Sequence, residues 1–475
     1  MKISEIIKLE EGKTLEFKRD LSSPKNILKT VVAFANTAGG KIIVGLEDKT
    51  RKVIGIENPL DEEERFCNLV ADSISPCLVP NIELTTVEGK TLLIIEVFLS
   101  NSRPHYLSAP GPEAGTLVRL GSTNRQADRE LITEIGRFVQ GVSFDETPMV
   151  NLTVDDLDLE SARRIFNGLR ELTLTELHTL KLLTTCQGES VPTKGGMLLF
   201  GKNRTFHFSD CWVQCGRFIG KDKARIFDHT EFEEPLPQMV DSIMFFLKKH
   251  AMRSADFSEV RRKDVWDIPL EPLREAVINA LVHADYSQRG GPIRVAFFDD
   301  RIEIESPGIL PSGITVEDMK DGVSKIRNPV IARIFRELKL IEQWGSGVPR
   351  MYRETVAEGF PEPKVIELGL KTRFIFPLAK SLKVREGEGA QSNLDLETLS
   401  TPGAQSGAQS KILESLIEKP MSASEIALVL GVKSKTGSLK RTIKQLLENG
   451  LIEYTIPEKP NSRLQKYRLV NKKIH

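Results

Sequence analysis

The chain has 475 residues, enough for about three or four domains of ordinary size. Lysine and arginine number 66, and aspartate and glutamate also number 66, so the net charge is zero. A zero net charge argues against a uniformly basic DNA-coating protein, and any electrostatic attraction to nucleic acid has to be local. No apolar run approaches the roughly 18 residues that span a membrane. The amino terminus is too polar for a signal peptide, and the five cysteines lack framework spacing. We therefore expect a cytoplasmic protein.

The first 50 residues predict a strand, a helix and a second strand. The helix is expected over Pro24–Gly40, between a strand at Leu15–Lys18 and a strand at Lys41–Asp48. Because the helix returns the chain alongside the first strand, we expect the two strands to be neighbours in one sheet.

This pairing brings three carboxylates together, those of Glu11, Glu16 and Asp48. Converging acids repel one another unless a cation or a proton separates them. Oxygen-rich clusters suit Mg²⁺ or Mn²⁺, and a metal beside Lys18 and Arg19 suits phosphate chemistry. The alternative is that the acids are solvated surface or strand-edge residues.

The motifs around these residues resemble the Schlafen-type AlbA domain. They run from about residue 10 to residue 130 in this order: Glu11-x4-Glu16-Phe-Lys, Ala33-Phe-Ala-Asn-Thr-Ala-Gly-Gly40, Gly45-Leu-Glu-Asp48, Arg103-Pro-His-Tyr106 and Leu117-Val-Arg-Leu-Gly-Ser-Thr-Asn124. Domains of that family bind DNA or RNA, and some members cleave structured RNA with a metal held by three acids. The resemblance implies that Glu11, Glu16 and Asp48 are the metal ligands and catalytic acids.

The composition and patterning divide the chain into five parts, which makes it an α/β multidomain protein. The expected parts are a Schlafen-AlbA-like α/β domain (1–130), a mixed helical and strand connector (131–264), a second α/β unit (265–380), a flexible linker (381–410) and a winged helix-turn-helix (411–475). Small polar repeats of Gly-Ala-Gln-Ser identify the linker. In the connector, the pattern predicts a strand at Cys211–Ile219 and a helix at Pro237–His250.

The second α/β unit is expected to open with a helix at Pro272–Ala284. A hairpin follows, with strands at Ile293–Phe298 and Arg301–Ser306 and a type I′ turn at Asp299-Asp300. A strand at Lys371–Pro377 is expected to close the sheet.

Polar residues at helical spacing mark this opening helix. Glu275, Asn279 and His283 are each four residues apart, so they share one helix face. The amide oxygen of Asn279 can bind Mg²⁺, while Glu275 can orient a water molecule. Gly345 and Gly347 precede a later helix, where backbone amides can approach a phosphate. The alternative is a solvated helix face followed by ordinary loop glycines.

These features together resemble a divergent GHKL-type ATPase domain, an α/β sandwich similar to the carboxy-terminal part of certain helicase-related regulators. The matching motifs are Glu275-x3-Asn279, His283-Ala-Asp-Tyr, Pro307-Gly308-Ile-Leu-Pro, Arg327-Asn-Pro and Gly345-Ser-Gly347. The resemblance implies ATP as cofactor, Asn279 as the metal ligand and Glu275 as the base that activates water. It also places His283, Gly308, Gly345 and Gly347 at the nucleotide. The Asp-x-Gly-x-Gly motif of that family is absent, and Glu305-Ser-Pro-Gly308 stands in its place.

The carboxy-terminal part carries 13 lysines and arginines against six glutamates. Such an excess is typical of a module that contacts DNA. In a winged helix the third helix enters the major groove and the wing lies on the backbone. The expected nucleic-acid contacts there are Lys435, Lys440, Arg441, Lys444, Arg463 and Lys466. The alternative is a winged helix that mediates protein contacts.

The order of parts favours a nucleic-acid-binding transcriptional regulator that responds to nucleotide and acts as a homodimer on paired half-sites. The alternative is a metal-dependent endoribonuclease of Schlafen type that cleaves structured RNA such as tRNA, in which Lys18 neutralises charge on the phosphate. The chain lacks a Gly-x4-Gly-Lys-Ser/Thr phosphate loop, which disfavours a helicase-like motor.

Overall fold

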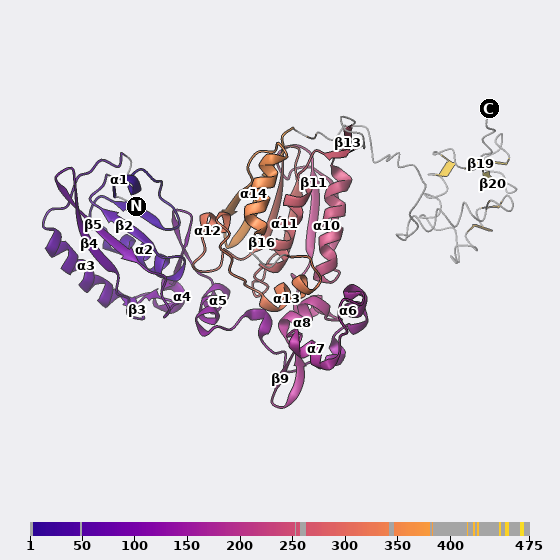
Figure 1. Cartoon of the computed structure of the whole chain (residues 1–475), viewed down its shortest axis with the longest axis horizontal. Coiled ribbons are helices and arrows are strands. Elements are labelled where there is room, and N and C mark those ends of the chain that lie inside the picture. The colour runs from indigo at the N-terminus through magenta and orange to yellow at the C-terminus, as the bar shows by residue number, and fades with distance from the viewer. Residues whose placement is uncertain are drawn as a thin grey trace. The chain divides into compact units, whose positions relative to one another are not determined.

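The computed structural model describes residues 3–47, 50–251, 253–256, 263–341, 346–380 and 382, and it describes residues 416, 421–422, 425–426, 446–447, 452–455 and 466–469 of the carboxy-terminal part. The chain forms two compact units, Met1–Arg385 and Glu386–His475. The expected linker at 381–410 lies outside the described residues except for Leu382, which packs into the core of the first unit. Figure 1 shows the elements of both units in chain order.

The amino-terminal domain is built on a four-stranded sheet with the order β1-β2-β5-β4. Its strands are β1 (Leu15–Lys18), β2 (Gly40–Val44), β4 (Asn81–Val87) and β5 (Lys90–Val97). Strands β1 and β2 pair in parallel, which confirms the predicted neighbours. The helix between them, α2 (Pro24–Asn36), ends four residues earlier than expected, because Gly39 and Gly40 adopt positive φ angles of 72° and 157°. Strand β2 likewise ends at Val44, before a positive φ at Gly45.

Helices and short strand pairs complete this domain. They are α1 (Ile3–Ile6), α3 (Pro59–Ser73), β3 (Ile74–Ser75), β6 (Tyr106–Leu107), α4 (Gly111–Gly115), β7 (Leu117–Leu120) and β8 (Thr123–Gln126). Helix α2 has nine buried residues, seven of which belong to the hydrophobic core, so it covers one face of the sheet. The hairpin β7–β8 packs on α2.

A helix and a small subdomain follow. Helix α5 (Arg129–Gln140) begins at Asp128, whose side chain caps the Leu131 amide, and it ends at Gly141 with a φ of 68°. The subdomain contains α6 (Leu159–Phe166), α7 (Leu174–Thr179), β9 (Leu183–Cys186), β10 (Glu189–Pro192), α8 (Lys194–Phe200) and α9 (Arg204–His207). Two 3-10 turns precede it, at Phe144–Glu146 and Val154–Asp156.

The second sheet has six strands in the order β12-β11-β15-β16-β18-β17. The strands are β11 (Val213–Phe218), β12 (Ile226–Phe232), β15 (Ile293–Phe297), β16 (Arg301–Pro307), β17 (Lys364–Glu367) and β18 (Lys371–Pro377). Strand β11, which we expected in the connector, pairs in parallel with β15, so the sheet begins well before residue 265. Strand β18 has the predicted bounds, but β17 lies at the edge beyond it.

The two faces of this sheet differ in polarity. Helices α10 (Leu236–His250), α11 (Leu270–Val282) and α14 (Gly347–Ala357) lie together along it (Figure 1). Ile302, Ile304 and Phe374 join the hydrophobic core, while the alternating Glu305 and Arg373 form an ion pair. A strand of period two thus gives one face to the core and the other to charged residues.

The remaining elements of the first unit are β13 (Arg253–Asp256), β14 (Lys263–Trp266), α12 (Val316–Lys320) and α13 (Pro329–Glu337). In the second unit, β19 (Ile452–Tyr454) pairs with β20 (Tyr467–Leu469). These two strands lie in the part expected to form a winged helix, which as a whole stays a prediction. Within the described part of the chain, no helix has the length and apolar character required to cross a membrane.

Candidate nucleotide-binding and nucleic-acid-binding sites

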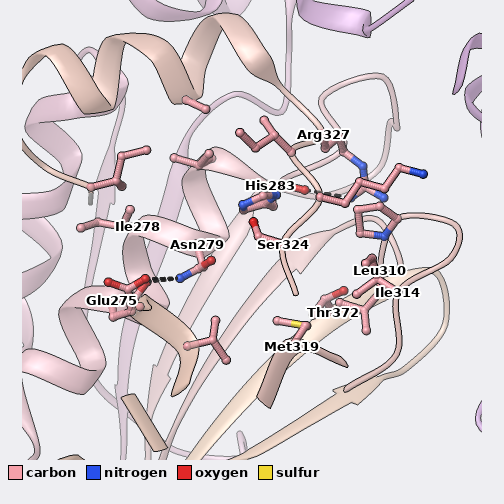
Figure 2. A pocket seen from close by; sticks show the side chains of 18 of the residues that line it. Glu275, Ile278, Asn279, His283, Leu310, Ile314, Met319, Ser324, Arg327 and Thr372 are labelled. Atoms are coloured by element: carbon pink, nitrogen blue, oxygen red, sulfur yellow. Dashed lines mark hydrogen bonds between the residues drawn. The ribbon is translucent and has the colours of Figure 1, made fainter. Parts of the chain in front are cut away.

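A cavity of about 340 Å³ opens between α11, the loop after β16, α12, α13 and the start of α14. Figure 2 shows Glu275 and Asn279 at one end of it, and His283 with Arg327 at the other. Apolar side chains such as Ile278, Ile314 and Met319 form the walls between the two ends. The cavity is of the size and mixed polarity that small-molecule sites have.

At the first end, helix α11 fixes the two residues that its spacing predicted to lie together. The side-chain amide of Asn279 donates to the Glu275 carboxylate and to the Glu275 backbone carbonyl, both at 2.8 Å. These two bonds use the amide nitrogen, so the amide oxygen of Asn279 is the atom suited to a cation. An added Cβ at Gly347 would lie 2.0 Å from a carboxylate oxygen of Glu275, so the start of α14 passes very close to this side chain.

At the second end, Arg327 joins three segments around His283. The guanidinium donates to the Glu134 carboxylate at 2.7 Å, to the His283 carbonyl at 2.8 Å and to the Ile309 carbonyl at 2.5 Å. Burial, together with the nearby Arg327 charge, lowers the pKa of His283 to about 4. The imidazole is therefore neutral at physiological pH and can give a ligand a hydrogen bond.

Gly308 lies just behind this end rather than in the cavity wall. Its φ is +98°, and an added Cβ would lie 2.4 Å from an Arg327 nitrogen. The glycine thus lets the turn after β16 pass close to Arg327. Gly345, which was predicted to contact phosphate, lies outside the described residues.

Three basic residues that the motif analysis did not single out also line the cavity: Lys325, Arg336 and Arg350. Arg336 is half-buried, and its Nε has no hydrogen-bond partner in the part of the chain that the structure describes. Ala332 and Arg336 are four residues apart on α13 and both face the cavity. That spacing is the signal that could have found Arg336, although only the fold shows where α13 packs.

These residues fit a nucleotide with Mg²⁺. Magnesium keeps several waters and takes only one or two protein ligands beside the substrate phosphates, so a single oxygen from Asn279 is enough. Arg336 and Arg350 offer positive charge for phosphate oxygens. The neutral and apolar walls suit a base and a ribose.

The predicted acids of the amino-terminal domain meet basic partners. Glu16 is 7% exposed, and its carboxylate forms ion pairs with Arg119 and with Lys18. Arg119 is itself 1% exposed, and it also donates to the Gly12 carbonyl at 3.1 Å and to the Asn124 side chain at 2.9 Å. A metal at Glu16 would have to compete with two cations for the same oxygens.

Glu11 lies beside Glu16, and Asp48 lies outside the described residues. The exposed Glu11 accepts the Phe17 backbone amide at 2.8 Å, which holds its carboxylate at the residue that follows Glu16 in β1. Among the residues that the structure describes, no group of three His, Cys, Asp or Glu side chains could hold a metal. The three-acid site therefore stays a prediction.

Several basic residues of this domain are exposed. Arg19 follows β1, and Lys25 and Lys29 lie one turn apart on α2. The Asn124 side chain donates to Thr30 at 2.9 Å, which holds β8 against α2, and the next residue on β8 is the exposed Arg125. Exposed cations of this kind can contact phosphates.

Most of the predicted contacts in the carboxy-terminal part lie outside the described residues: Lys435, Lys440, Arg441, Lys444 and Arg463. Lys466 is described and exposed, and its ammonium lies 4.0 Å from Glu425. On the paired strand, Arg468 bonds to Glu453 at 2.7 Å.

The Arg119–Glu16 pair gives a stability prediction. Arg119→Met leaves the Glu16 carboxylate buried without its main partner, which costs about 3–5 kcal/mol of unfolding free energy. Urea denaturation followed by circular dichroism measures the loss. The double variant Glu16→Gln/Arg119→Met removes the stranded charge and is expected to regain most of it. A single variant within about 1 kcal/mol of the parent would contradict this role of the pair.

Three family models match separate parts of the chain. Residues 11–128 match "Schlafen, AlbA_2", and residues 290–376 match "Putative ATP-dependent DNA helicase recG C-terminal", an ATPase-like domain. Residues 409–470 match "Filamentation induced by cAMP protein Fic-like, C-terminal domain". The first two matches agree with the resemblances found in the sequence.

Two solved structures are similar to the chain. The DIP2311 protein of Corynebacterium diphtheriae is 22% identical, covers 96% of this chain and 92% of its own, and has a TM-score of 0.42. The N-terminal domain of a putative ATP-dependent DNA helicase RecG-related protein from Nitrosomonas europaea is 26% identical, covers 26% of this chain and 89% of its own, and has a TM-score of 0.22. The family matches therefore join a Schlafen AlbA_2 domain to an ATPase-like domain in one chain, a combination that indicates nucleic-acid binding.

Proposed function

We propose that this protein is a nucleotide-responsive, nucleic-acid-binding transcriptional regulator. The AlbA_2 domain and the basic carboxy-terminal part would hold DNA or RNA. ATP with Mg²⁺ would bind in the cavity between α11 and α14. The observation that carries the proposal is a set of contacts that tie the wall of this cavity to the amino-terminal domain.

The first contact is the carboxylate of Glu367. It accepts the Leu310 backbone amide at 2.8 Å, and Leu310 lines the cavity. The same carboxylate pairs with Lys13 at 2.9 Å, and the two side chains are only 5% and 10% exposed. Lys13 follows Gly12, whose carbonyl accepts a hydrogen bond from Arg119, the partner of Glu16. A short chain of bonds thus joins the cavity wall to the acid cluster.

The second contact lies at the end of α2. The Gly313 amide donates to the Thr37 carbonyl at 2.6 Å, and the Ser312 hydroxyl donates to the Asn36 carbonyl at 3.2 Å. The Thr37 hydroxyl in turn accepts the Arg119 backbone amide at 2.9 Å. Gly12 and Thr37 both bond to Arg119, so a nucleotide that moves the 310–313 loop would shift both of these partners of Arg119. Such a shift is the physical basis on which nucleotide would alter nucleic-acid affinity.

Nucleotide binding is tested by thermal unfolding with ATP and Mg²⁺. Ligand at about 100 times its dissociation constant stabilises a protein by about 2.7 kcal/mol, which raises the melting temperature by several degrees. Asn279→Ala is expected to abolish this rise because the metal loses its protein oxygen. Asn203→Ala, at an exposed asparagine, is the matched control and is expected to keep the rise. An Asn279→Ala protein that responds like its parent would refute this assignment.

Coupling is tested by fluorescence anisotropy with labelled duplex DNA, with and without Mg-ATP. We expect nucleotide to change the affinity of the parent at least threefold, and we expect Glu367→Gln to reduce that factor toward one because the bond to Lys13 loses its charge. Glu362→Gln, at an exposed glutamate paired with Lys320, is the control. An unchanged nucleotide effect in Glu367→Gln would disprove the coupling.

Removal of residues 411–475 is expected to abolish DNA binding. Full affinity without these residues would remove the regulator role.

A second candidate function is a metal-dependent endoribonuclease. The bond from the Phe17 amide to Glu11 favours it, because this bond holds a second carboxylate near Glu16. In this function Mn²⁺ or Mg²⁺ held by Glu11, Glu16 and Asp48 would activate the nucleophile, with Lys18 at the phosphate. Incubation of tRNA with the protein and Mn²⁺ is expected to give discrete fragments that disappear in Glu16→Ala/Asp48→Ala. Intact tRNA with every divalent metal tried would eliminate the nuclease.

A further inference from the structure

A second cavity, of about 480 Å³, lies on the other side of the turn after β16. It is bounded by the 3-10 turn at Phe144, by the segment 206–211 and by residues 285–289. Pro307 lines this cavity, whereas its neighbour Ser306 lines the first one. None of the residues predicted from the sequence to act chemically lines this second cavity.

Two cations lie over the ring of Phe144, which lines this cavity. The Lys194 ammonium lies 4.2 Å from the centroid of the Phe144 ring, and the Arg137 guanidinium carbon lies 5.3 Å from the same centroid. Both side chains are half-buried. Within the described part of the chain neither forms an ion pair with a carboxylate, and Arg137 bonds only to the Ser287 hydroxyl, at 3.2 Å.

Each of the two acids that line the cavity accepts hydrogen bonds through one of its two carboxylate oxygens. Asp210 accepts the Ser209 hydroxyl at 3.1 Å and the Gly290 amide at 3.2 Å. Asp285 accepts the Ser287 amide at 3.0 Å and the Ser287 hydroxyl at 2.5 Å. Asp285 also affects Glu134. Burial, with the nearby Asp285 charge added to it and the Arg327 charge opposing it, raises the pKa of Glu134 to about 7.

The surroundings of Lys194 disfavour its charge. Burial is the main cause that lowers the pKa of Lys194, and the nearby Arg137 charge adds to it. Two like charges held together in a partly buried place are unfavourable unless an anion lies between them. Gln288, which lines the cavity, offers a third donor, because its buried side-chain nitrogen has no partner among the described residues.

The apolar walls of the cavity suit a flat or aromatic group on the ligand. The Phe144 and Phe208 rings meet edge to face at 6.3 Å, and Met149 extends the same apolar surface. Phe206, which also lines the cavity, is 84% exposed. The volume matches that of sites that enclose small organic molecules.

We propose that this cavity binds a small organic oxyanion, a planar or aromatic molecule whose carboxylate or phosphate group contacts Lys194, with the charge of Arg137 nearby at Phe144 and Ser287. Its flat part would lie against Phe144 and Phe208, and Gln288 would donate to a further acceptor. The inference is independent of nucleotide binding in the first cavity. The Asp285 amide donates to the Pro307 carbonyl at 2.8 Å, and both residues line this cavity, so an occupant here would lie against the segment that carries Ser306 and Gly308.

The test is isothermal titration of the full chain with benzoate, phenyl phosphate and inorganic phosphate. Benzoate and phenyl phosphate distinguish a carboxylate ligand from a phosphate ligand, and inorganic phosphate reports the anion without its aromatic part. We expect one of the two aromatic probes to bind with one-to-one stoichiometry and at least ten times more tightly than inorganic phosphate.

Variants locate the binding. Lys194→Met is expected to weaken the aromatic probe at least tenfold, while Lys202→Met, at an exposed lysine just after the same helix, is expected to leave it unchanged. Arg137→Met tests the same pair of charges without altering Lys194 and is expected to show a similar loss. Without ligand, Lys194→Met is expected to melt at or above the parent temperature, because a repelled charge is removed. A fall of several degrees would mean that Lys194 is structural and would overturn the proposal. Failure of both aromatic probes to bind the parent, or full affinity in both variants, would also overturn it.

Discussion

The ion pair between Glu367 and Lys13 is the interaction on which the arrangement of the first unit depends. Both side chains are nearly buried, and the carboxylate also holds the Leu310 amide. Breaking a buried pair by removing one partner strands the other charge and costs several kcal/mol, so the pair resists separation. The pair connects two parts of the unit, since Leu310 lines the first cavity while Lys13 precedes the strand that carries Glu16. The contact therefore belongs to both candidate sites at once.

Buried guanidinium groups join segments in the same way at three other places. Arg119 holds Glu16, the Gly12 carbonyl and Asn124. Arg327 binds α5 through Glu134 and also bonds to two carbonyls at the first cavity. Arg217 bonds to Asp299 at 2.7 Å and to the Leu382 carbonyl at 2.5 Å, which fixes the end of the first unit. Each guanidinium uses its fan of donors to satisfy several acceptors, which a lysine could not do.

The local sequence pattern was enough to predict the elements and pairs that depend on residues close together in the sequence. The strand β1, the hairpin β15–β16, strand β18 and the shared face of Glu275 and Asn279 all follow from periodicity and turn residues. Long-range pairing was not predictable in this way. Strand β11 joins β15 across about 80 residues, and no local signal distinguishes it from a connector strand. Arg119 and Glu16 are 103 positions apart, so the charge partner of the acid appears only in the fold. Arg336 and Lys194 were missed for the same reason, because neither carries a motif.

The account implies that one structure links a nucleotide cavity to a nucleic-acid surface through Leu310, Glu367 and Lys13. Hydrogen–deuterium exchange of the full chain with and without Mg-ATP tests this claim most directly. The account predicts that nucleotide changes amide protection both around residues 308–314 and at residues 12–18 and 36–40. Changes confined to residues 270–375, with the amino-terminal domain unaffected, would contradict it.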